Sequence, residues 1–349
     1  MPKSVKRLAC LIFAALAALL LTQGCCLVDE DQSDCSVDVS LRYEMRLVTN
    51  ITTEIDTQLS LLSEAEVNAA LKRYMRDVFT DFAHDAQLSF YDAEPKDSLR
   101  LEYIDTILNA ATAFIEIDIP AHHYDHRAIA NLRDNGALIQ VGDDRLPTAR
   151  LQMVRRDTVP SMQTGVFFGH TDISIADNED QTFKVELHMI NCANALVLDT
   201  LGSHIRDMKV YTTGFASELS VRDSLYNYAY SPIVVADPVD IGEAGLCYAA
   251  VVMPSHQPED TRTIIEEDDS FVTDGDDSVA FWEYRIYATL ADGTVTFTRL
   301  SVGTPLKGGQ LKVLKARVCD DGSVRTGDSA VSASVELDWQ EAGQYEPEL

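Results

Sequence analysis

The chain has 349 residues, with 28 lysine and arginine residues against 56 aspartate and glutamate residues, so its formal net charge is −28. A chain this acidic would be repelled by phosphates, and no lysine- and arginine-rich run offsets the charge, so we exclude a nucleic-acid partner. The hydrophobic content of 46% is that of a globular protein, and the length suits two domains or one large one.

The N-terminus has the pattern of a bacterial lipoprotein signal peptide over residues 1–24. A short cationic segment precedes the apolar run 8–21, which is shorter than the roughly 20 residues that span a membrane. Gly24 stands directly before Cys25. We therefore expect cleavage before Cys25 and acylation of its thiol and amino groups, with Cys26 as a poorer acceptor. The alternative is a plain secretory signal followed by an unmodified Cys25.

Residues 25–35 form a lipidated acidic tether in this interpretation. Cleavage of the signal peptide removes three cationic residues and no acidic ones, which changes the net charge from −28 to −31. An anionic leaflet would repel such a body, so the acyl chains would supply the whole membrane contact. The acidic run also resembles the surface-export signal of Bacteroidota lipoproteins, although a solvated linker has the same composition.

Beyond the tether, apolar residues alternate with polar ones, which predicts half-buried β-strands. The clearest alternation covers residues 37–47, where Val39, Leu41 and Tyr43 share one face. Further predicted strands are, in chain order, 86–91, 112–119, 149–154, 165–175, 183–189, 195–200, 207–212, 246–253, 282–290, 294–301, 310–319 and 333–339.

One long helix is predicted after the first strand. Ser63 and Glu66 have capping-box spacing, and apolar residues then recur at helical intervals as far as Val78. A weaker helical turn is predicted at 126–132.

Turn dipeptides such as Asp292–Gly293 separate the short strands, which indicates antiparallel sandwiches. A polar turn at 176–180 divides the strands into two groups. We therefore predict an all-β chain of two antiparallel β-sandwich domains, 36–180 and 181–349, with one accessory helix.

Two clusters have residue types that bind metals. His122 and His126 would share a face in a helix and could hold a transition metal, but the segment follows Pro120 and is expected to be a surface loop. The acidic run 268–277 is rich in oxygen ligands but lacks the spacing of a calcium loop, which favours a solvated loop. We predict no metal site.

Neither the remaining cysteines nor any known catalytic motif indicates a catalytic site. Cys192 and Cys247 lie in apolar, strand-like sequence and are expected to be buried thiols. A nucleophile pair of His188 and Cys192 fails, since four strand positions separate the two by about 13 Å. A bridge between Cys26 and Cys35 is possible.

No phosphate loop, dinucleotide fingerprint, zinc-protease motif or nucleophile elbow occurs in the sequence. We therefore predict that the chain is not an enzyme and that it has no catalytic residues and no cofactor.

Several short segments together resemble the fimbrial anchor family of Bacteroidales, the FimB-type proteins. The segments that carry the resemblance are 79–84 with 88–92, the stretch 119–132, the turn 164–170, the strand 185–194 and the terminal strand 335–339. The match covers nearly the whole chain after the signal. It departs at Ile129–Ala130, where the family has a tryptophan.

The resemblance implies two transthyretin-like sandwiches in a lipid-anchored protein of the outer membrane that faces outward at the base of a fimbrium, with pilin subunits as partners. Stalk pilins lose an N-terminal strand and accept one from a neighbour, which is β-augmentation. An anchor cut at Arg42 or Arg46 would lose its lipid, so the strand 37–47 should complete its own sandwich. The fimbrium would then contact another edge, with the C-terminal strand 331–339 as the candidate.

A second hypothesis is a surface lipoprotein that binds glycan or acts as a fimbrial tip adhesin. Exposed aromatic residues on a sheet face would favour it, whereas the chain has only two tryptophans and 8% aromatic residues. A hydrolase is a third hypothesis, with no residue pair to support it.

Overall fold

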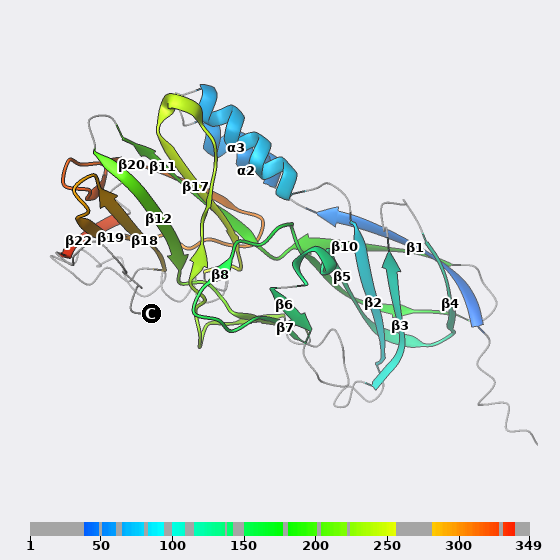
Figure 1. Cartoon of the computed structure of the whole chain (residues 1–349). Coiled ribbons are helices and arrows are strands. Elements are labelled where there is room, and N and C mark those ends of the chain that lie inside the picture. Colours follow the sequence, from blue (N-terminus) through cyan, green and yellow to red (C-terminus); the bar gives the residue numbers. More distant parts are fainter. Residues whose placement is uncertain are drawn as a thin grey trace, which may run out of the picture.

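Most of the chain that the structure describes is β-strand, with two long helices. The structure is a computed structural model and describes residues 38–48, 51–60, 65–79, 83–93, 100–108, 115–136, 138–141, 150–176, 181–200, 204–221, 224–255, 281–327 and 331–338. Figure 1 shows an elongated molecule with a group of strands toward each end. None of its described helices combines the length and the apolar character of a membrane span.

The first sheet has seven strands in the order β3-β2-β5-β9-β10-β1-β4. Their bounds are β1 Asp38–Val48, β2 Asp85–Asp92, β3 Arg100–Leu108, β4 Ile115–Pro120, β5 His123–Ala130, β9 Phe167–Ser174 and β10 Gln181–Met189. The strand predicted at 37–47 is thus confirmed as β1. It pairs antiparallel with β4 but parallel with β10, so the sheet is mixed rather than purely antiparallel.

This sheet curls so that its two halves face one interior. In the strand order, β9 and β10 lie between β5 and β1, which would separate β5 from β1 by about 14 Å in a flat sheet. The Tyr43 hydroxyl of β1 nevertheless lies 2.6 Å from Nε2 of His126 in β5. The apolar face of β1, with fully buried Leu41 and Tyr43, therefore packs against the opposite half of the same sheet.

Two further sheets form a sandwich, and all their strands except β8 come from the second half of the chain. The six-stranded sheet has the order β22-β19-β18-β12-β15-β8 and the five-stranded sheet the order β16-β17-β11-β20-β21. Their bounds are β8 Val159–Pro160, β11 Cys192–Asp199, β12 Ile205–Thr213, β15 Val234–Val235, β16 Asp237–Pro238, β17 Leu246–Val252, β18 Trp282–Leu290, β19 Val295–Val302, β20 Leu311–Val318, β21 Val324–Thr326 and β22 Val331–Asp338. The Tyr284 hydroxyl donates to Oδ1 of Asn194 across the two layers at 2.8 Å. The strands predicted in this region are confirmed, and β11 and β20 pair in parallel.

A pair of helices, α2 (Ile51–Ser60) and α3 (Ala65–Val78), covers the five-stranded sheet (Figure 1). The apolar sides of both helices are buried, and the Tyr74 hydroxyl of α3 donates to Oδ2 of Asp237 in β16 at 3.0 Å. The predicted helix is confirmed as α3. The second helix, α2, was not predicted, because it begins with β-branched residues that lower helix propensity.

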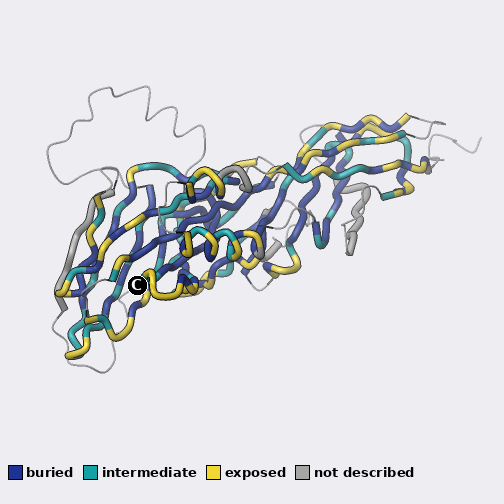
Figure 2. Tube along the Cα trace, turned by 90° about the horizontal axis from the view of Figure 1, so that it is seen from above, coloured by how far each residue is buried: buried dark blue, intermediate teal, exposed yellow. Residues whose placement is uncertain are grey.

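A small sheet joins the two ends of the molecule. Its order is β14-β13-β7-β6, with β6 Ile139–Val141, β7 Arg150–Met153, β13 Glu218–Ser220 and β14 Leu225–Asn227. Figure 2 shows buried residues along the whole length of the molecule, and they form one contiguous hydrophobic cluster.

Backbone pairing crosses the boundary predicted after residue 180. β10 begins at Gln181 yet belongs to the first sheet, and β8 ends at Pro160 yet belongs to the six-stranded sheet. The division into two domains remains a prediction. Residues before and after position 180 thus contribute strands to the same sheets.

The helical turn predicted at 126–132 is wrong. Residues 123–130 form β5, and only Arg133–Asn135 form a short 3-10 helix. The last five residues of β5 are all buried and include the polar His126 and Arg127, so the strand shows neither a sustained alternation nor an apolar run. The sequence pattern therefore lacked the signal by which the other strands were predicted.

Candidate functional site

The first strand, β1, is held on both sides by the sheet. Over Leu41–Tyr43 it pairs with β10 on one side and β4 on the other. Removing β1 would therefore break two ladders and expose the buried side chains of Leu41 and Tyr43. This arrangement agrees with the prediction that the strand completes its own sheet.

His126 fixes β1 from the opposite side of the interior. Its Nε2 accepts from the Tyr43 hydroxyl at 2.6 Å, and its Nδ1 donates to the Ser89 carbonyl at 3.0 Å. Its ring stacks on Phe90 with centroids 4.2 Å apart. Burial lowers the pKa of His126 to about 3, so the imidazole is neutral and both nitrogens are satisfied by the protein.

The cluster of three histidines at 122–126 does not come together. His126 points into the interior, whereas His122 and His123 are exposed. His122 contacts Asp92 at 2.9 Å and His123 contacts Ser174 at 2.8 Å. The surface loop expected here is therefore a strand, and strand alternation sends its histidines to different partners.

Three side chains of types that bind metals lie close together on the neighbouring strands β5 and β9, namely Asp125, His170 and Asp172. Asp125 already accepts two hydrogen bonds from the buried Arg127, at 2.8 and 2.9 Å, and His170 lies 3.3 Å from it. Burial alone would raise the pKa of Asp125, but hydrogen bonds from His170 and Arg127 hold it well below its usual range. This arrangement fits an ion-pair network better than a metal site. Sequence reasoning missed it, because β5 and β9 pair over a separation of some 45 residues.

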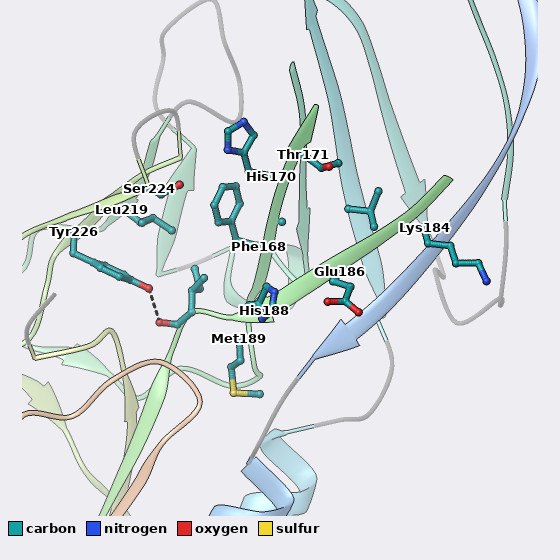
Figure 3. A pocket seen from close by; sticks show the side chains of 13 residues that line it. Phe168, His170, Thr171, Lys184, Glu186, His188, Met189, Leu219, Ser224 and Tyr226 are labelled. Atoms are coloured by element: carbon teal, nitrogen blue, oxygen red, sulfur yellow. Dashed lines mark hydrogen bonds between the residues drawn. The ribbon is translucent and has the colours of Figure 1, made fainter. Parts of the chain in front are cut away.

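A groove lies between the first sheet and the small sheet (Figure 3). Its volume is about 510 Å³. One side is formed by β9 and β10 with Phe168, His170 and His188, and the other by Tyr226 and Ser224 at β14. Gly169 lets β9 approach β10 closely here, since a Cβ atom would meet the Glu186 carbonyl at 2.6 Å. No motif in the sequence indicated this groove, because its residues come from four separate segments.

Two ion pairs beside the groove join β10 to β1. Lys184 Nζ lies 3.4 Å from Glu44 Oε2, and Arg46 Nη1 lies 3.3 Å from Glu186 Oε1. The Arg46 side chain is 76% exposed, but the strand that carries it is part of the sheet. An arginine-specific protease would have to unpair β1 in order to reach its backbone.

The C-terminal strand β22 lies at the end of the six-stranded sheet. It pairs antiparallel with β19 on one side, and no described strand pairs with its other edge. The predicted docking strand is therefore an edge strand, which can accept a further strand.

The two cysteines expected to be buried are buried. Cys192 opens β11 and Cys247 lies in β17, and burial raises the pKa of both thiols, to about 12 at Cys247. His188 lies exposed on β10, in a different sheet from Cys192, so the two form no catalytic pair.

Several predictions lie outside the described residues. They are the signal 1–24, the tether 25–35 with Cys25, Cys26 and Cys35, the acidic run 268–277 and the residues after β22.

No family model matches the chain, and no curated protein sequence matches it. Solved structures of similar architecture include the fimbrial anchor protein Mfa2 from Porphyromonas gingivalis, with 12% identity, a TM-score of 0.47 and coverage of 86% of this chain and 99% of that one. A fimbrial assembly protein from Parabacteroides distasonis has 10% identity, a TM-score of 0.38 and coverage of 87% and 99%. Identities and scores of this size are too low to transfer a function.

Proposed function

We propose that the chain is an outer-membrane lipoprotein that anchors a fimbrium to the cell surface and takes part in its assembly. The N-terminal signal pattern and the segments that resemble fimbrial anchor proteins support this role. In this proposal Cys25 carries the acyl chains, the acidic body faces outward, and pilin subunits are the partners.

The observation that carries the proposal is the position of β1. The proposed lipid site at Cys25 lies 13 positions before Asp38, the first residue of β1. A cut within β1 would separate the lipid from the folded body. A strand that is paired on both sides and hydrogen-bonded to His126 is suited to remain in place, as the attachment of an anchor requires.

The proposed contact with the fimbrium is the outer edge of β22. Main-chain groups at an edge supply affinity to an added strand, and side-chain pockets supply specificity. Because β1 fills its own place in the first sheet, that place is closed to a donor strand. The edge of β22 offers the pilin a different position.

Deletion of the gene followed by electron microscopy tests the anchoring role. Loss of the protein should release fimbriae into the medium, and the full-length gene should restore their attachment. Complementation with Cys25→Ala should restore fimbrium formation without attachment. Fimbriae that stay on the cells in the deletion strain would contradict the proposal.

A pair of proline variants tests the docking edge. Along β22 the N–H groups point alternately toward β19 and away from it, so one of Ser334→Pro and Val335→Pro removes an outward donor without breaking the β19 ladder. The variant that stays folded by circular dichroism should bind less pilin. Ser334→Ala and Val335→Ala, which keep both main-chain N–H groups, are the controls. Equal pilin binding by all folded variants would exclude this edge.

A further inference from the structure

The groove between the first sheet and the small sheet holds two aromatic rings in fixed positions. Tyr226 donates from its hydroxyl to the Ile190 carbonyl at 3.0 Å, as the dashed line in Figure 3 shows. Phe168 is half-buried and packs against the hydrophobic core. Since both rings are already held in place, binding of a ligand to them costs little side-chain conformational entropy.

Hydrogen-bonding side chains surround these rings. His170, His188 and Ser224 are exposed along the groove, and Figure 3 shows His170 above the ring of Phe168. The contact of 3.3 Å with Asp125 holds the His170 imidazole in position. Imidazole N–H groups donate hydrogen bonds and hydroxyl groups both donate and accept them, which suits a ligand rich in hydroxyl groups.

The charges in the groove are already compensated. Lys184 pairs with Glu44, and Glu186 pairs with Arg46. With no unmatched cation among these pairs, and with a chain charge of −28, the groove would not attract a polyanion. A neutral ligand fits these electrostatics better than an acidic one.

We propose that this groove binds a neutral oligosaccharide. The rings of Phe168 and Tyr226 would contact the apolar faces of the sugar rings, while His170, His188 and Ser224 would bind sugar hydroxyl groups. The volume of about 510 Å³ lies within the usual range for small-molecule sites. The saccharide site is independent of the anchoring role and would add a binding function to the same protein.

An array of neutral and anionic oligosaccharides, probed with the detergent-solubilised full chain, tests the proposal. At least one neutral member should bind, and titration calorimetry with that oligosaccharide should then give a Kd. Phe168→Leu keeps an apolar side chain but removes the ring, and should weaken binding roughly three- to tenfold. His188→Ala changes an exposed side chain and should also weaken binding.

His123→Ala and Tyr230→Leu are matched controls outside the groove and should leave the Kd unchanged. Unfolding curves for all four variants separate lost binding from lost folding. The proposal is wrong if no neutral array member binds, if anionic members bind more tightly than neutral ones, or if the two groove variants that fold bind as the unaltered protein does. Displacement of the oligosaccharide by a neutral extended peptide at a lower concentration would instead assign the groove to peptides and overturn the proposal.

Discussion

The hydroxyl of Tyr43 in β1 lies 2.6 Å from Nε2 of His126 in β5, and this hydrogen bond ties the first strand to the opposite half of its own sheet. Both side chains are fully buried. No water is needed to satisfy either group, because His126 uses its other nitrogen on the Ser89 carbonyl. The first strand is therefore held by two backbone ladders and by one buried side-chain contact.

Tyr43→Phe should destabilise the protein by about 1–3 kcal/mol, because it leaves Nε2 of His126 buried without a partner. Urea unfolding measures the change. Tyr230→Phe is the control, since it removes an exposed hydrogen bond to the Arg156 carbonyl and should cost less than about 0.5 kcal/mol. Equal losses of unfolding free energy in the two variants would show that the buried hydrogen bond stabilises the protein no more than the exposed one.

Stability should fall with decreasing pH because His126 is buried in its neutral form. Its pKa is lowered from 6.5 to about 3 in the folded protein, so the unfolded state binds the proton more tightly. The contribution is complete above pH 6.5 and is lost at about 1.4 kcal/mol per pH unit between pH 6.5 and 3.

Unfolding free energies at pH 6.5 and pH 5 test this dependence before most carboxylates titrate. His126→Gln should remove that part of the slope, whereas His123→Ala, at an exposed position, should retain it. An unchanged slope in His126→Gln would assign the pH dependence to other groups.

Asp125→Asn should cost about 3 kcal/mol of unfolding free energy, since the Arg127 side chain is only 4% exposed and would lose its charged partner. Glu186→Gln breaks the pair with Arg46, whose side chain is 76% exposed, and should cost less than about 1 kcal/mol. Thermal or chemical unfolding compares the two. A cost at Asp125 as small as that at Glu186 would contradict the buried network.

Gly169→Ala should destabilise the sheet by about 1–3 kcal/mol, because the new Cβ would meet Leu187 Cδ2 at 2.5 Å and the Glu186 carbonyl at 2.6 Å. Gly327→Ala has open space around it and should be nearly neutral. Differential scanning calorimetry of both variants measures the difference. A neutral Gly169→Ala would mean that β9 and β10 can move apart freely.

The strands that the sequence predicted well have either one buried and one polar face, like β1, or a short apolar run, like β11 and β17. β1 is the clearest, since Leu41 and Tyr43 are buried while Arg42 between them is exposed. β5 was missed because His126 and Arg127 are buried in it, and two polar residues in succession interrupt both patterns. The helix α3 was predicted from its cap and its spacing, whereas α2, with Ile55 and Leu59 at helical spacing, begins with β-branched residues that lower helix propensity.

The sequence patterns could not predict which strands pair with one another. β1 pairs in parallel with β10, some 140 positions away, for example at Glu44 and Lys184. Nothing local encodes such a pairing, because it depends on how the whole sheet curls. The groove was missed for the same reason, as its residues meet only after the first sheet and the small sheet are in place.

The N-terminus of the protein on fimbriated cells tests the anchoring proposal most directly. Mass spectrometry of the protein isolated with cell-attached fimbriae should find an acylated Cys25 in one uncut chain with Arg42 and Arg46. An N-terminus at Tyr43 or Leu47, with no acylated peptide in the fimbrial fraction, would contradict the account and indicate a stalk or tip subunit instead.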